Sequence, residues 1–255
     1  MTATKTIEMK SPAEIEIMRE AGRIVGDILV VLSAAAAAGA STAELDRIAR
    51  KELAARKAQP AFLGYRGFPA ALCVSINSEV VHGIPSDKRR LAEGDLVSLD
   101  FGAIVRGFYA DAAVTVGVGR ISARAQELVR ATEDSLAKGV AAFQIGARLG
   151  DISSAVQKRA ESSGFSVVRD FVGHGIGRAL HEDPAVPNYG APGTGPRLSI
   201  GMVLAIEPMI NAGGPEVEVL QDGWTAVTKD GALSAHFEHT VALTEHGPEI
   251  LTAHA

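Results

Sequence analysis

The chain has 255 residues, 47% of them hydrophobic, and a net charge of −5 at pH 7. This length suits one large domain with a complete core, and the acidic balance argues against a general nucleic-acid binder. No stretch is apolar and long enough to span a membrane, and Lys5, Glu8 and Lys10 interrupt any secretory leader. The single cysteine, Cys73, cannot form an intramolecular disulfide, which favours a reducing cytoplasm.

Four segments have the pattern of amphipathic helices. After a short arm, expected to be loose over residues 1–10, residues 11–14 form a capping box with proline at the first helical position. Residues 41–44 repeat this signal ahead of a second helix. Helices at about 122–142 and 149–163 restate the first pair.

The remaining segments are mostly strand-like. A central hairpin is predicted over residues 94–111, with its turn at 105–107. Residues 59–69 and 181–196 are predicted to be loops. The other predicted strands cover residues 71–77, 80–85, 165–172, 202–210, 216–219, 224–227 and 236–244. Helix pairs that alternate with antiparallel strands predict an α+β fold, with a curved sheet backed by helices.

An internal repeat relates the two parts of the chain. Residues 94–100 align without a gap on residues 201–207, an offset of 107. With different gaps, His82 matches His174 and Asp111 matches Glu238. We interpret this as an old duplication that leaves one domain over residues 1–255, with pseudo-two-fold halves at about 12–117 and 124–244. Such halves would bring four carboxylates to one centre.

The candidate metal ligands are four carboxylates and one imidazole: Asp100, Asp111, His174, Glu207 and Glu238. Each aspartate could instead end a strand facing water, and His174 could be a satisfied core histidine. Recurrence in both halves, and the glycines that flank His174, favour a shared site. Buried carboxylates require a positive partner, and this oxygen-rich set suits Mn²⁺, Fe²⁺, Co²⁺ or Zn²⁺. Four negative charges exceed what one divalent ion balances, so we expect two ions and a hydrolytic centre.

Several motifs together resemble the type I methionine aminopeptidases, which share the pita-bread fold with prolidase and creatinase. The similarity covers about residues 5–252, and the motifs lie at 64–69, 81–85, 94–100, 173–178, 181–184, 206–208, 222–224 and 238–240. The glycine-rich motif at 173–177 alone could pass for a nucleotide loop, but the combination is specific. No zinc-binding or proline-rich N-terminal extension is seen, so we expect the short bacterial form.

The resemblance implies a hydrolase that removes the initiator methionine from nascent proteins and peptides when the second residue is small. It implies that Asp100 and Asp111 chelate one metal ion and that His174 and Glu207 hold the other. Asp111 and Glu238 would bridge both ions. In the same family, the residue matching Glu207 also serves as general base and then acid.

The resemblance also implies roles in substrate binding. His82 would hydrogen-bond the substrate near the scissile amide, and His181 would steady the developing oxyanion. Six residues map onto the pocket for the methionine side chain: Phe62, Tyr65, Phe68, Cys73, Leu180 and Trp224. A flexible thioether suits aromatic and thiol neighbours, although plain core packing is the alternative for each of the six.

Two other functions are the alternatives: a proline-specific peptidase of the same fold, and a binding module that has lost catalysis. Prolidase and creatinase carry an extra N-terminal domain for which about ten residues before the first helix leave no room, and the complete ligand set argues against lost catalysis.

The expected partners are polypeptides with an N-terminal methionine, not DNA or a membrane, and we expect a cytoplasmic monomer. The basic cluster at residues 88–90 either contacts the ribosome transiently or is an ordinary solvated loop.

Overall fold

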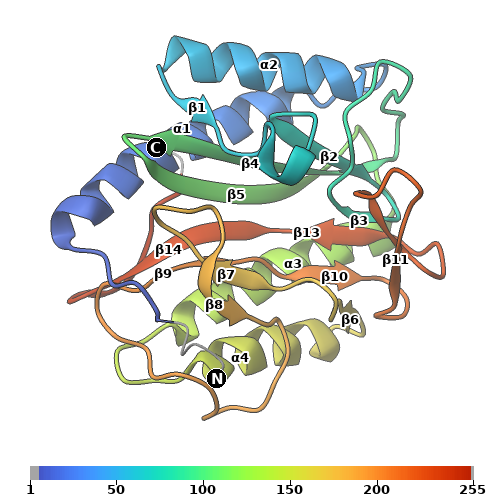
Figure 1. Cartoon of the computed structure of the whole chain (residues 1–255). Helices are drawn as coiled ribbons and strands as arrows, with labels where there is room; N and C mark the ends of the chain where they lie inside the picture. Colours follow the sequence, from blue (N-terminus) through green and yellow to red (C-terminus); the bar gives the residue numbers. More distant parts are fainter. Residues whose placement is uncertain (1–5, 254–255) are drawn as a thin grey trace.

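The computed structural model describes residues 6–253 and packs two helix pairs against a curved antiparallel sheet (Figure 1). The helices are α1 (Pro12–Ala35), α2 (Thr42–Ala55), α3 (Ala123–Ala142) and α4 (Leu149–Ser162). Both predicted caps are present, because the Ser11 and Ser41 side chains accept hydrogen bonds from the backbone N–H groups of Glu14 and Glu44. All four helices begin within a residue of the predicted positions, and α3 and α4 also end within a residue of theirs.

The main sheet has nine strands in the order β1-β4-β5-β14-β9-β7-β8, with β2 paired to β4 and β15 paired to β14. Their bounds are β1 (Gln59–Pro60), β2 (Leu72–Ile76), β4 (Leu96–Val105), β5 (Phe108–Gly117), β7 (Gly173–Gly175), β8 (Glu182–Val186), β9 (Val203–Ile206), β14 (Glu238–Thr244) and β15 (Gly247–Ile250). One small sheet contains β13 (Ser234–His236), β10 (Met209–Asn211) and β6 (Ser166–Val167). The other contains β11 (Val217–Val219), β12 (Ala226–Thr228) and β3 (Glu79–Val81).

The predicted central hairpin is formed by β4 and β5. The two strands pair from Leu96↔Gly117 to Val105↔Phe108, so Arg106 and Gly107 make a two-residue turn. Both turn residues have positive φ, 49° and 81°, as the tight hairpin turn compatible with strand twist requires. This long, fully paired hairpin carries Asp100 and Asp111 on adjacent strands.

The strand order is symmetric about the β5–β14 pair. Moving outward, β5 is followed by β4 and β2 on one side, and β14 by β9 and β7 on the other. Where β5 meets β14, Ala112 pairs with His239 and Ala113 with Glu238. A pseudo-two-fold axis through the Ala112–His239 pair therefore relates the strand of Asp111 to the strand of Glu238.

The symmetry changes one interpretation of the repeat. His174 lies on β7, which pairs with β9 as β2 pairs with β4, whereas His82 follows β3 in a small sheet. The strand order therefore makes β2 the counterpart of the strand carrying His174, whereas His82 lies after β3, the strand that follows β2. The boundaries of the halves, 12–117 and 124–244, stay a prediction.

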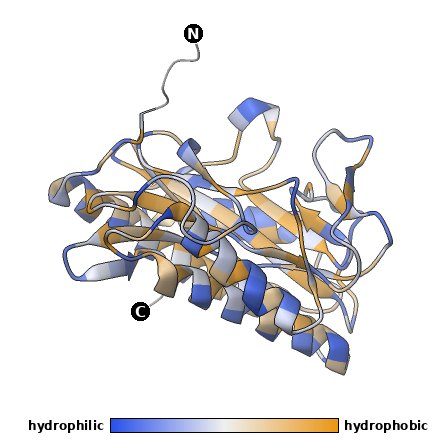
Figure 2. Cartoon of the chain, turned by 90° about the horizontal axis from the view of Figure 1, so that it is seen from below, coloured by the Kyte–Doolittle hydropathy of each residue, from blue (hydrophilic) through white to orange (hydrophobic). Residues whose placement is uncertain are grey.

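The core lies between the helices and the sheet, in two main parts. In the first half, Ile28, Leu32 and Leu45 of α1 and α2 pack with Phe101 of β4. In the second half, Leu136 and Ile152 of α3 and α4 pack with Leu204 and Val241 of β9 and β14, among others. Figure 2 shows strands that are largely hydrophobic and helices that alternate between hydrophobic and hydrophilic segments, as amphipathic helices do.

Several strand predictions were incomplete. The expected loop at 181–196 contains β8, the expected strand at 165–172 is reduced to β6, and β15 was not predicted. The segment 202–210 is divided into β9 and β10 at Glu207 and Pro208, since proline has no N–H to donate to a ladder. In the part of the chain that the structure describes, no helix is both long and apolar enough to cross a membrane.

The N-terminal arm is not loose throughout. Residues 1–5 lie outside the described residues, but Lys10 is only 6% exposed and its backbone N–H donates to the Gly201 carbonyl at 2.7 Å. Residues close to the first helix are therefore part of the packed structure.

Candidate metal centre and substrate pocket

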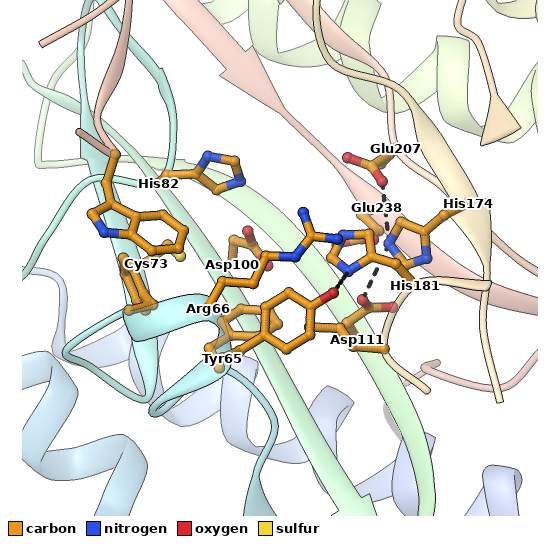
Figure 3. A pocket seen from close by; sticks show the side chains of 14 residues that line it. Tyr65, Arg66, Cys73, His82, Asp100, Asp111, His174, His181, Glu207 and Glu238 are labelled. Carbon is orange, nitrogen blue, oxygen red and sulfur yellow. Dashed lines mark hydrogen bonds and ion pairs between the residues drawn. The ribbon is translucent and has the colours of Figure 1, made fainter. Parts of the chain in front are cut away.

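The five predicted metal ligands come from five neighbouring strands or strand ends. Asp100 and Asp111 lie on β4 and β5, His174 on β7, Glu207 directly after β9, and Glu238 at the start of β14. Figure 3 shows their side chains converging on one region of the pocket. Asp111, His174 and Glu238 are buried, and each offers a ligand atom within 4.8 Å of the others.

His174 presents a lone pair to two of these carboxylates. Its Nδ1–H donates to the Gly175 carbonyl at 2.9 Å, which leaves Nε2 unprotonated in the neutral ring. Nε2 lies 3.6 Å from Asp111 Oδ2 and 3.5 Å from Glu207 Oε1. Burial lowers the pKa of His174 to about 4, so the ring is neutral at pH 7. Nε2 and the two carboxylate oxygens are thus three acceptors that face one another, an arrangement that a cation stabilises.

The carboxylates also need a cation to ionise together. Burial and the neighbouring acids raise the pKa values of Asp100, Glu207 and Glu238 well above the ordinary range. Burial raises the pKa of Asp111 to about 7, although its hydrogen bond with Thr240 acts in the opposite direction. A hard donor set of this charge fits divalent metal ions, and the residues present therefore match the group that the resemblance implies.

Three polar neighbours of the ligands were not predicted as site residues. Thr240 Oγ1 accepts from the Asp111 N–H at 3.1 Å and also lies 3.1 Å from Asp111 Oδ1. Asn188 Nδ2 donates to the Glu207 carbonyl at 3.0 Å. The ring of His236 is 2% exposed, with Nε2 3.9 Å from Glu207 Oε2. Strand alternation could have indicated Thr240 and His236, since each lies two residues from Glu238.

Every predicted site residue lines one pocket, and Arg66 is the only addition among the 14 lining residues drawn in Figure 3. The apolar part is aromatic, with Phe68 and Trp224 meeting edge to face at 5.1 Å between ring centroids. His82 packs edge-on against Trp224 at 6.2 Å and Phe171 at 5.4 Å. Its φ of 63° is uncommon for a residue with a side chain and is typical of functional sites.

His181 lies between the aromatic part of the pocket and the carboxylates. Its Nδ1 is 2.9 Å from the Tyr65 hydroxyl, and its ring is stacked on Tyr65 and 4.2 Å from the His174 ring centroid. Burial, with His174 and Arg66 nearby, lowers the pKa of His181 to about 4. When Tyr65 donates to Nδ1, the proton of the neutral ring is on Nε2, which is then a donor.

Comparisons with known proteins agree with this geometry. The model of metallopeptidase family M24 matches residues 16–245. A methionine aminopeptidase of Clostridium perfringens is 54% identical over 246 residues, which are 96% of this chain and 98% of the relative. The crystal structure of a methionine aminopeptidase from Thermotoga maritima matches with a TM-score of 0.96 and 49% identity, covering 97% of this chain and all of that one.

A prolidase from Pyrococcus furiosus shares the fold alone, with a TM-score of 0.75 and 23% identity over 97% of this chain and 66% of that one. The curved sheet with four helices is therefore the pita-bread fold that was predicted. Together, the family model and the close relatives show that the chain belongs to metallopeptidase family M24 and, within it, to the type I methionine aminopeptidases.

Proposed function

We propose that this enzyme removes the N-terminal methionine from nascent proteins and peptides whose second residue is small, using two divalent metal ions. The observation that carries the proposal is the set of facing acceptors on His174, Asp111 and Glu207. They line the same pocket as a group of aromatic side chains. The preference for a small second residue rests on the resemblance to the family.

The ions would be held by Asp100, Asp111, His174, Glu207 and Glu238. Bound there, divalent ions polarise a carbonyl and supply a water-derived nucleophile at neutral pH. Glu207 would accept and return a proton, and burial among the neighbouring acids raises its pKa above that of an ordinary carboxyl group. The Nε2–H of His181 would donate to the carbonyl oxygen of the scissile amide as negative charge develops on it.

The rest of the pocket would bind the substrate. His82 is neutral at pH 7, since burial lowers its pKa to about 4, and its ring would hydrogen-bond the substrate backbone. Phe62, Tyr65, Phe68, Cys73, Leu180 and Trp224 would surround the methionine side chain. The Cys73 thiol is buried, and burial and the adjacent Asp100 raise its pKa, so it would act there as a neutral, polarisable group.

We further propose that the enzyme works as a monomer in the cytoplasm, where nascent chains become available. A transient ribosome contact would depend on Lys88 and Arg90. Arg89 is committed to the fold, because it pairs with Glu79 and donates to the Ile84 carbonyl at 2.7 Å. Reversing the charge of Lys88 and Arg90 should thus weaken ribosome co-sedimentation in a salt-dependent manner.

The function is tested by adding Fe²⁺, Mn²⁺, Co²⁺ or Zn²⁺ to the metal-free enzyme while metal content and turnover are measured. We expect cleavage of Met-Ala-Ser, little cleavage of Ala-Pro peptides, and activity that rises with up to two ions per chain. Preferential cleavage of Ala-Pro peptides would indicate a proline-specific peptidase. Absence of turnover with every metal would indicate a binding module.

A further inference from the structure

A buried ion pair connects the start of α1 to the loop that carries His181. Lys10 Nζ pairs with Glu182 Oε2, and the two side chains are only 3% and 10% exposed. The two residues are 172 positions apart in the chain. Neither belongs to the 14 residues that line the pocket. A buried ion pair is seldom a net source of stability, so its role is better sought in the geometry that it fixes.

The pair belongs to a well-satisfied hydrogen-bond network. Glu182 Oε1 accepts from the backbone N–H groups of Arg178 at 2.7 Å and Ala179 at 3.1 Å, which closes the loop on itself. Lys10 Nζ also donates to the Glu8 carbonyl at 3.1 Å. The Lys10 backbone is tied separately to Gly201, at the turn before β9. Networks satisfied in this way hold one geometry.

The loop is shaped to receive the lysine. A Cβ atom at Gly177 would lie 2.2 Å from Lys10 Cε and 2.8 Å from its Nζ, so the lysine occupies the space that a side chain would need. The Gly177 carbonyl accepts from the Tyr109 N–H at 2.8 Å, which ties the same loop to the strand of Asp111. A second contact joins Arg178 to Glu14 of α1 at 2.6 Å, but Arg178 is 62% exposed and that pair contributes less.

We propose that Lys10 and Glu182 are positioning residues that hold the loop 177–182 so that His181 points at the scissile carbonyl. Glu182 directly follows His181, and the ring of His181 is otherwise located by its bond to Tyr65. Losing the ion pair removes the buried anchor of the loop, while Gly177 stays bonded to Tyr109 and Tyr65 still contacts the His181 ring. The inference rests on the proposed role of His181 as oxyanion donor.

The test compares Lys10→Met and Glu182→Gln with the wild type in the metal-loaded enzyme. Both variants should lower kcat on Met-Ala-Ser by about 10- to 100-fold, as a small displacement of a catalytic group does, with little change in KM or in bound metal. Lys10→Arg keeps the charge pair and should recover part of kcat. In a His181→Ala background, Lys10→Met should cause no further loss, since the two changes act on one interaction.

Arg19→Met is the matched control. Arg19 lies on α1, which begins two residues after Lys10, and forms a partly buried ion pair with Glu249 on β15, 2.6 Å apart. Its hydrogen bonds go to Glu249 and Glu16, not to the loop. Its loss should leave kcat unchanged even where thermal stability falls. Thermal denaturation of every variant separates a loss of folded protein from a loss of positioning.

An equal loss of kcat from Lys10→Met with and without His181 would overturn the proposal, as would an unchanged kcat. NMR of the His181 ring supplies a second measurement. Lys10→Met should shift the signals of the ring and weaken its contact with Tyr65. If His181→Ala alone left kcat unchanged, the proposed role of His181 would fail. The NMR measurement would then test independently whether Lys10 and Glu182 position the His181 ring, and unchanged His181 signals would refute that role.

Discussion

At the scale of single residues, the site is defined by groups that conflict with one another without a cation. Neutral His174 directs a lone pair at Asp111 and Glu207, while burial keeps the pKa of Asp111 near 7. Such conflicts are tolerated where binding of a ligand relieves them. Neutralising one of these residues should therefore have opposite effects on the stability of the metal-free and the metal-bound protein.

Asp111→Asn should separate metal binding from folding. The change removes one charge and one ligand oxygen, so affinity for at least one ion should fall and kcat should drop by several orders of magnitude. The metal-free variant should fold as well as the wild type or better, because a buried acid has been neutralised. Calorimetric metal titration, peptide kinetics and urea unfolding measure the three effects. Near wild-type kcat at saturating metal would contradict a bridging role.

His181→Ala and His174→Ala should differ in kind. Loss of His181 should leave metal content intact and reduce mainly kcat, by about 10²- to 10³-fold, as removal of an oxyanion donor does. Loss of His174 should loosen one metal ion, and excess metal should restore part of the activity. Metal content measured beside Met-Ala-Ser kinetics distinguishes them. The reverse pattern would exchange the two assignments.

The sequence motifs located the residues that line the pocket, candidate ligands included, because these residue types stand out at fixed spacings. Lys10 could not be assigned in this way. A lysine in an N-terminal arm is usually exposed, and only the fold reveals that Glu182 meets it across the chain. Thr240 and His236 were also missed, because alternation around Glu238 is a short local signal and the groups that they approach, on Asp111 and Glu207, lie elsewhere in the chain.

At the scale of elements, local signals predicted structure well where the structure is local. The helices follow from capping boxes and periodicity, and the β4–β5 hairpin follows from two long runs around a short turn. The strands β6, β8, β13 and β15 have two to five residues each, and their pairing partners are distant or their patterns too brief to see. Tertiary pairing, not propensity, decides such strands.

The hairpin turn offers a test at this scale. Gly107 has a φ of 81°, and no atom lies within 4 Å of the position that a Cβ would take, so Gly107→Ala introduces backbone strain without a clash. We expect a loss of about 1–2 kcal/mol in the free energy of unfolding. Gly107→Asn is the matched control and should lose less, since asparagine tolerates this conformation. Equal urea midpoints for Ala, Asn and wild type would show that the turn imposes no such demand.

At the scale of the whole molecule, the symmetric sheet explains how four carboxylates reach one place. The β5–β14 pairing brings the strands of Asp111 and Glu238 side by side, and β4 and β9 flank them with Asp100 and Glu207. The repeat in the sequence predicted this convergence. It did not predict that β7 takes the place of β2 on the second side, which gives the site its one candidate histidine ligand. The molecule thus combines a nearly symmetric frame with an asymmetric site.

The concentration of acids should make stability depend on metal and pH together. In the metal-free protein, the raised carboxyl pKa values mean that the native state binds more protons than the unfolded state, so stability falls as pH rises. The three histidines of the pocket act oppositely. His82, His174 and His181 have pKa values lowered from 6.5 to about 4, so their contribution rises with pH only within that interval.

The two effects oppose each other up to about pH 6.5, and above it only the carboxylates contribute. The free energy of unfolding of the metal-free enzyme should therefore fall between about pH 6.5 and pH 8. Saturating Mn²⁺ should reverse the trend, because the ion binds the ionised ligands and stabilises the native state more as they deprotonate. Urea unfolding at several pH values, with chelator or with Mn²⁺, measures both slopes. Asp111→Asn should flatten the metal-free slope, and an unchanged slope in this variant would mean that Asp111 is not among the groups responsible.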